Sequence, residues 1–77
     1  MEERDLDLIR ELAPANPELD QLYSEHLELE KQLEEFDQRR YLTPEEQVKR
    51  KRLQKTKLAG RDRIEAILAA YRAQASA

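Results

Sequence analysis

The chain contains no cysteine and no tryptophan, and its 77 residues include only one glycine and three prolines. Without cysteine, neither a disulfide framework nor a thiolate metal site can form. No stretch alternates apolar and polar residues with a period of two, so strands are not expected. No apolar run approaches the roughly 20 residues that a membrane span requires. These absences predict one small all-α domain over residues 1–77, with no membrane among its partners.

Two stripes of mainly apolar residues recur at alternating steps of three and four. The first stripe consists of Leu19, Leu22, His26, Leu29, Leu33 and Phe36. The second consists of Leu53, Lys57, Gly60, Ile64, Ile67 and Tyr71. This spacing keeps residues on one side of a helix, as in the shared seam of a coiled coil. The pattern predicts an antiparallel two-helix hairpin with coiled-coil-like packing, preceded by a short N-terminal helix.

Local start and stop signals set the expected helix limits. Asn16 can cap a helix that begins at Pro17, because proline at the first helical position loses no backbone hydrogen bond. Thr43 and Glu46 flank Pro44 in the spacing of a capping box. We therefore expect a short helix over residues 4–12, an acidic helix over 17–40 and a basic helix over 44–72. The sequence leaves open whether residues 4–12 dock on the hairpin.

The hairpin register follows from placing Leu33 opposite Leu53. Continuing the pairing gives Leu29 with Lys57, His26 with Gly60, Leu22 with Ile64, and Leu19 with Ile67. His26 would then face the one residue without a side chain, which would explain a mid-helix glycine that costs about 1 kcal/mol relative to alanine. The same register predicts an ion pair between Glu25 and Arg63 and a ring-to-guanidinium contact between Tyr23 and Arg61. Whether the helix stays continuous through Gly60 is left open.

Four further apolar residues fall outside the seam on one side of the predicted hairpin: Tyr23, Leu27, Leu58 and Leu68. A broad apolar face of this kind implies a cover. Either the 4–12 helix folds back over it or a second copy of the hairpin does. The alternative is that single exposed leucines are ordinary and need no partner. These four residues are the predicted interface.

Charge is distributed unevenly along the chain, although the net charge is only −3. Residues 1–47 carry 15 acidic and 5 basic residues, whereas residues 48–77 carry 9 basic and 2 acidic ones. One interpretation is that the basic helix folds onto the acidic helix. The other is that outward-pointing Lys51, Arg52 and Lys55 meet a nucleic acid or another polyanion. The first is favoured, because the acidic chain as a whole repels phosphate.

No constellation of catalytic, cofactor-binding or metal-ligating residues is recognisable. His26 is the only histidine, and it is interpreted as a polar seam residue that is hydrogen-bonded across the hairpin or fixes its register. Ser24 and Ser76 have no suitably spaced partner for a hydrolytic triad. A two-helix hairpin also offers no pocket of several hundred cubic ångströms for a small-molecule substrate. We expect a protein that is not an enzyme and that binds no cofactor.

Two segments resemble the YdcH-like family of small bacterial proteins, which is defined as a domain of unknown function. The segments are Glu25-His26-Leu27-Glu28-Leu29-Glu30, and Leu53 and Leu58 followed by Arg61-Asp62-Arg63-Ile64 and Ile67-Leu68. The resemblance covers about residues 17–72. It departs from the family pattern at Arg61-Asp62, where Lys-Asp is usual, and at Gly60. It implies a cytoplasmic bacterial helical hairpin and supplies no established activity.

Together these observations predict a cytoplasmic interaction module that forms a homo-oligomer or binds another helical protein. The N-terminal residues 1–5 are acidic and lack the basic start and apolar run of a signal peptide, which fits this location. The alternative prediction is polyanion or nucleic-acid binding through Lys51, Arg52 and Lys55.

Overall fold

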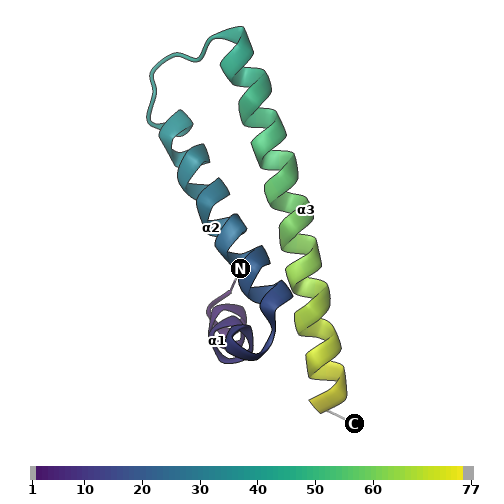
Figure 1. Ribbon diagram of the computed structural model, residues 1–77. Helices are drawn as coiled ribbons and strands as arrows, with labels where there is room; N and C mark the ends of the chain where they lie inside the picture. The colour runs from purple at the N-terminus through teal and green to yellow at the C-terminus, as the bar shows by residue number, and fades with distance from the viewer. Residues whose placement is uncertain (1, 76–77) are drawn as a thin grey trace.

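The computed structural model describes residues 2–75 and is helical apart from its connecting segments (Figure 1). Helix α1 spans Glu3–Leu12 and continues into a short 3-10 turn, η1, over Ala13–Ala15. Helix α2 spans Pro17–Asp37 and helix α3 spans Pro44–Ala75. The molecule is elongated, with principal extents of 51 × 21 × 16 Å. Over these residues, no helix combines the length and the apolar character needed to span a membrane.

Both long helices begin with side-chain caps. The Asn16 side-chain oxygen accepts a hydrogen bond from the Leu19 backbone N–H at 3.1 Å. At α3, the Thr43 hydroxyl accepts from the Glu46 N–H, and the Glu46 carboxylate accepts from the Thr43 N–H, both at 3.1 Å. These bonds satisfy N–H groups of the first helical turn, which have no carbonyl partner within the helix. The predicted caps are therefore present, and α2 ends three residues earlier than expected because the chain already turns at Gln38.

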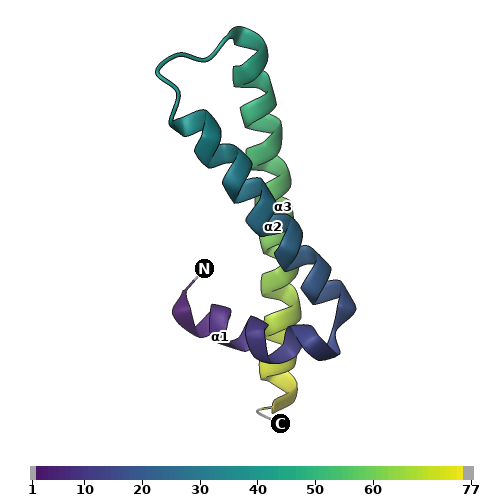
Figure 2. The same cartoon turned by 60° about the vertical axis from the view of Figure 1, so that its left-hand side comes forward.

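Helices α2 and α3 lie side by side, run in opposite directions and are joined by the segment 38–43 (Figures 1 and 2). The two helices diverge toward this segment and approach each other at the opposite end. There α1 packs across both of them (Figure 2). Residues 4–12 therefore dock on the hairpin. Helix α3 also continues through Gly60 without a break.

The apolar core lies where the three helices meet, and does not extend along the whole predicted seam. It consists of Ile9 from α1, Leu19 from α2, and Ile64 and Leu68 from α3. Leu8, Leu12, Leu22, Tyr23 and Ile67 pack against it. Nearer the 38–43 segment, Leu33 and His26 are buried, whereas Leu29, Phe36 and Leu53 are only partly buried. Because the long helices diverge there, the core is deepest under α1.

Candidate functional site

The candidate site is the side of the hairpin on which α1 packs, called here the α1-side face. On α2 it is formed by Tyr23, Leu27 and Glu30, and on α3 by Leu58, Arg61, Glu65 and Leu68. Both sets follow steps of three and four residues, which align side chains along one side of a helix. Contacts of α1 with Tyr23 and Leu68, and the Lys57–Glu30 ion pair, place these rows on the same side. Helix α1 covers one end of the face and leaves the other end open.

Leu68 lies under α1 and not on an exposed surface. Its side chain is 1% exposed and packs in one cluster with Ile9, Leu19 and Ile64. Of the two covers predicted for this apolar face, the 4–12 helix is the one that lies over Leu68. The predicted seam residue Tyr71 is exposed, contrary to expectation. The physical reason is the third helix. Because α1 packs on this side of α3, the buried side of α3 includes Leu68.

Leu27 and Leu58 lie on the uncovered part of the α1-side face. Their side chains are 46% and 44% exposed, respectively. Leu58 is close to the centre of α3, which runs from Pro44 to Ala75. Tyr23 is partly buried against the core. Of the four predicted interface residues, the structure thus leaves Leu27 and Leu58 open to a partner, while α1 occupies the region of Tyr23 and Leu68.

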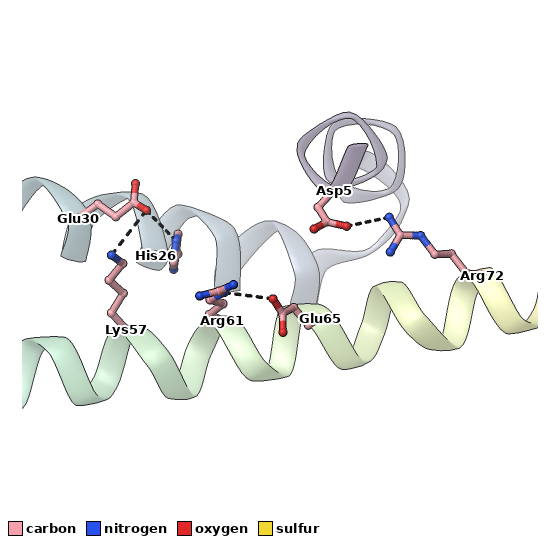
Figure 3. A network of polar contacts seen from close by, with 7 residues as sticks. All are labelled: Asp5, His26, Glu30, Lys57, Arg61, Glu65 and Arg72. Atoms are coloured by element: carbon pink, nitrogen blue, oxygen red, sulfur yellow. Dashed lines mark hydrogen bonds and ion pairs between the residues drawn. The ribbon is translucent and has the colours of Figure 1, made fainter. Parts of the chain in front are cut away.

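Polar contacts within α2 and α3 and between them lie along the α1-side face (Figure 3). Glu30 lies 2.9 Å from His26 Nε2 and 3.9 Å from Lys57 Nζ, so its carboxylate connects α2 to α3. One turn further along α3, Arg61 Nε donates to Glu65 at 3.1 Å. The open part of the face thus carries two ion pairs, Glu30–Lys57 and Arg61–Glu65. Exposed pairs of this kind contribute little to stability but define a charge pattern that a partner can complement.

His26 is 5% exposed, and its Nδ1 atom has no hydrogen-bond partner within residues 2–75. Its other ring nitrogen, Nε2, meets Glu30 one turn away on the same helix. This geometry fits the tautomer in which Nε2–H donates to the carboxylate and Nδ1 carries a lone pair. The predicted hydrogen bond across the hairpin is therefore replaced by a bond within α2, and Glu30 makes the crossing contact to Lys57.

The steric explanation for Gly60 is wrong. A Cβ atom added at this residue would meet no atom within 4 Å, so the imidazole of His26 does not occupy that space. Glycine is therefore not required by close packing at this point of α3.

We expect the substitution Gly60→Ala to stabilise the protein by about 1 kcal/mol, because alanine has the higher helix propensity and finds free space. Thermal unfolding followed by circular dichroism measures the effect. Ala59→Gly, one residue earlier on the exposed side, is the matched control and should destabilise by a similar amount. A destabilised Gly60→Ala variant would indicate a contact that the structure does not contain.

The flanking contacts predicted from the register also differ in the structure. Arg63 pairs with Glu18 at 2.6 Å, seven residues before the predicted partner Glu25. Arg61 pairs with Glu65 and not with the ring of Tyr23. Both arginines have long flexible side chains, so they pair with whichever carboxylate lies within reach, and the seam register alone does not fix that choice. Glu25 instead accepts a hydrogen bond from Gln21.

Most basic residues of α3 are neutralised inside the molecule. Arg50 pairs with Asp37 at 3.0 Å, Arg63 with Glu18, Lys57 with Glu30, and Arg72 with Asp5 at 2.8 Å. The folding of the basic helix onto acidic segments is thus observed directly. Lys51, Arg52 and Lys55 are exposed and make no ion pair within residues 2–75. They form the basic ridge, the outer surface of α3 near the 38–43 segment.

Asp5 fastens α1 to the C-terminal part of α3. Its carboxylate accepts a hydrogen bond from Arg72 Nη2 at 2.8 Å (Figure 3). This hydrogen bond and the charge of Arg72 lower the pKa of Asp5 below its ordinary value of 3.8. A lowered pKa in the folded state means that the ionised carboxylate stabilises the docked helix.

The contact between Asp5 and Arg72 therefore predicts an acid-sensitive docking of α1. The stabilisation by the ionised Asp5 carboxylate is complete above the pKa of Asp5 in the unfolded chain. It is lost as the pH falls below about 4 and then passes through the lower pKa of Asp5 in the folded protein. Amide hydrogen exchange measures this opening as the protection factors of the α1 amides, that is, exchange rates corrected for the intrinsic rate at each pH. These protection factors should be lower at pH 3 than at pH 6. Asp5→Asn should open faster already at pH 6 and respond less to acid. Equal pH responses in both proteins would contradict this role of Asp5.

The surface carries open hollows, only some of which involve α1. One of about 460 Å³ lies between α1, α2 and α3 and is lined by residues such as Leu12, Ile67 and Tyr71. Another of about 420 Å³ lies at the hairpin end, lined by Phe36, Arg40, Arg50 and Lys51 among others. The second hollow is formed by the hairpin and its connecting segment alone, so open hollows of several hundred cubic ångströms occur even without α1, contrary to the expectation. Both are open grooves on the surface.

Comparison with known proteins gave no match to a family model, a curated protein or a solved structure. Among residues 2–75, no group of three or more histidine, cysteine, aspartate or glutamate side chains converges to hold a metal ion. The site is therefore described by its geometry alone. It is an amphipathic helical face, partly covered by α1, that carries two exposed leucines and the ion pairs Glu30–Lys57 and Arg61–Glu65.

Proposed function

We propose that the protein is a non-enzymatic cytoplasmic interaction module that binds an amphipathic helix through the open part of its α1-side face. In this proposal α2 and α3 serve as a coiled-coil-like hairpin that displays the face, and the bound helix belongs to another copy or to another helical protein. The observation that carries the proposal is the exposure of Leu27 and Leu58 on the same face that already holds α1. No small-molecule substrate, cofactor or metal is part of it.

The docked α1 illustrates how this face accepts a helix. Ile9 is buried between α2 and α3, and Asp5 pairs with Arg72 at the edge. An amphipathic helix that packs its apolar side into a groove is the usual form of a helix-in-groove interaction. The open part offers the same elements, since Leu27 and Leu58 supply apolar contact area and Glu30, Lys57, Arg61 and Glu65 supply charges. This similarity supports the proposal of a second helix beside α1.

The proposal predicts that Leu27→Glu and Leu58→Glu lower the assembly mass and leave helicity nearly unchanged. Both residues are about half exposed, so a carboxylate there remains hydrated in the monomer but is costly in an apolar interface. Sedimentation velocity at micromolar concentration measures the mass, and circular dichroism measures helicity. Val48→Glu changes an exposed aliphatic residue of α3 outside the face and is the matched control. A strictly monomeric unmodified protein would argue against self-association, and loss of helicity would show that the leucines are core residues.

Binding of a polyanion through the basic ridge is the second candidate. Its support is that Lys51, Arg52 and Lys55 are exposed and unpaired, whereas most other basic residues of α3 are neutralised. Phosphate contacts release counterions, so the affinity for DNA or RNA should fall steeply as salt increases. Replacing the three residues by glutamine should reduce both the affinity and the salt dependence, whereas Lys31→Gln on α2 should not. Absence of binding at low salt would remove this candidate.

Membership of the YdcH-like family remains a proposal that rests on the two sequence segments given above. It is compatible with the all-helical fold and implies no activity. The interaction proposal depends on the α1-side face and not on this resemblance.

A further inference from the structure

The hollow at the end of the hairpin is a basic groove. Its walls come from the end of α2, the 38–43 segment and the first two turns of α3, and its volume is about 420 Å³. The ionisable residues that line it are Asp37, Arg39, Arg40, Arg50 and Lys51. Four positive charges and one negative charge give this lining a net charge of +3, although the chain as a whole carries −3. The groove is therefore a positive site on an acidic protein.

Two of the four cations in the groove have no internal partner. The other two pair within the molecule, as Arg39–Glu46 and Arg50–Asp37. Counting the carboxylate of Glu46 as well leaves a net charge of +2 at the groove. None of the ion pairs within residues 2–75 involves Arg40 or Lys51. An anionic ligand in the groove would supply the partner that each of these two cations lacks.

The positive charge continues from the groove along α3. Lys51 belongs both to the groove lining and to the basic ridge, whose other members are Arg52 and Lys55. Lys51 and Lys55 are four residues apart, so their side chains lie on the same side of the helix, about 6 Å apart along its axis. A single phosphate ion would contact only one part of this track, whereas a linear polyanion can follow it. The ligand is therefore expected to carry several anionic groups in a row.

An exposed aromatic ring lies beside the groove. Tyr41 stands in the chain between Arg40 and Leu42, both of which line the groove. Its side chain is 84% exposed, so most of the ring is free of contacts with the protein. Single-stranded nucleic acids bind to this combination, because their phosphates meet the cations and a base stacks on the ring. A duplex keeps its bases paired and stacked within itself, and an acidic peptide has no base to stack.

We propose that the groove and Tyr41 form a binding site for single-stranded nucleic acid, in which Arg40 and Lys51 contact phosphates and one base stacks on Tyr41. The basic ridge extends the contact to the phosphates that follow. This inference rests on the second candidate function, polyanion binding, and specifies the ligand and the site that receives its base. The site shares no residue with the α1-side face, so it is independent of the proposed binding of a helix.

Substitutions of Tyr41 test the stacking contact. Fluorescence anisotropy measures the affinity for a labelled oligothymidylate of about 12 nucleotides, and an oligouridylate of the same length is the RNA probe. We expect Tyr41→Ala to weaken binding about tenfold and Tyr41→Phe, which keeps the ring, to change it by less than about twofold. Tyr71→Ala, which removes a tyrosine near the opposite end of α3, is the matched control and should bind like the unmodified protein.

Arg40→Gln tests the phosphate contact. It should weaken binding about threefold or more at low salt and reduce the slope of log affinity against log salt concentration by about one. Lys31→Gln removes an exposed positive charge of α2 that does not line the groove, and it should change neither quantity. Circular dichroism verifies that all variants are folded.

Three outcomes overturn the inference. They are unchanged binding by Tyr41→Ala or Arg40→Gln, equal affinity for a duplex of the same length, and equally effective competition by polyglutamate. If Arg52→Gln with Lys55→Gln weakens binding while the Tyr41 and Arg40 variants do not, the groove site is excluded and polyanion binding through the basic ridge stands. Absence of binding to every one of these polymers at low salt removes the second candidate function together with the inference.

Discussion

Leu68→Ala is expected to destabilise the protein by about 2–5 kcal/mol, as is usual when a fully buried leucine is truncated to alanine. Leu68 packs against Ile9, Leu19 and Ile64 from all three helices, so few neighbouring atoms can move into the resulting cavity. Leu58→Ala is the matched control on the same face and the same helix. Since Leu58 is half exposed, we expect its truncation to cost less than about 1 kcal/mol.

Urea unfolding followed by circular dichroism measures both changes. For a domain of this size, a loss of several kcal/mol removes much of the total stability, so the Leu68→Ala variant should be partly unfolded at room temperature. The two substitutions also distinguish a bare two-helix hairpin from a hairpin with α1 docked on it. Equal, small losses at Leu68 and Leu58 would mean that both leucines are exposed in a bare two-helix hairpin. A large loss at Leu68 alone requires α1 to be docked over it.

Local chemistry explains how much of the fold was predictable. The helix starts at Pro17 and Pro44 follow from caps whose donors and acceptors lie within three residues of each other. The heptad steps identify Leu19, His26, Leu33 and Ile64 as inward positions, and all four are buried. Such features depend on the chain's own helical period, which tertiary packing does not alter.

The errors arise where a third element decides the outcome. Burial of Leu68 in place of Tyr71 depends on α1, which approaches from one side and changes the buried side of α3. A nine-residue amphipathic segment does not disclose in its sequence where it will dock. The assumption that Gly60 receives His26 failed for a related reason, since the coiled-coil register supposes a constant distance between helices that diverge in the structure.

The candidate site was predictable in its apolar residues and not in its polar ones. Leu27 and Leu58 are identified by their positions beside the seam. The Glu30 contacts and the Arg61–Glu65 pair were missed, although His26 and Glu30, like Arg61 and Glu65, show the spacing of four residues that brings helical side chains together. These two pairs could therefore have been predicted from the spacing. The contact between Glu30 and Lys57 could not, because it depends on the distance between α2 and α3.

His26→Leu is expected to stabilise the protein by about 1–2 kcal/mol, the second large effect that the structure predicts. Leucine has a similar volume, gains apolar burial and removes the buried Nδ1 that lacks a partner. The bond lost from Nε2 costs little, because the carboxylate of Glu30 is half exposed and can be hydrated while it keeps its contact with Lys57. His26→Ala is the opposing control, since the cavity that it leaves should destabilise by about 2–4 kcal/mol.

Urea unfolding at pH 7 compares the three proteins, and sedimentation velocity compares their assembly. A stabilised His26→Leu variant with unchanged assembly would make His26 a structural residue that leucine can replace. If leucine stabilises the fold but weakens the assembly, the histidine instead acts through Glu30 on the Glu30–Lys57 ion pair of the α1-side face. A destabilised His26→Leu variant would contradict the prediction, because it would mean that the bond from Nε2 to Glu30 outweighs the burial of a bare nitrogen.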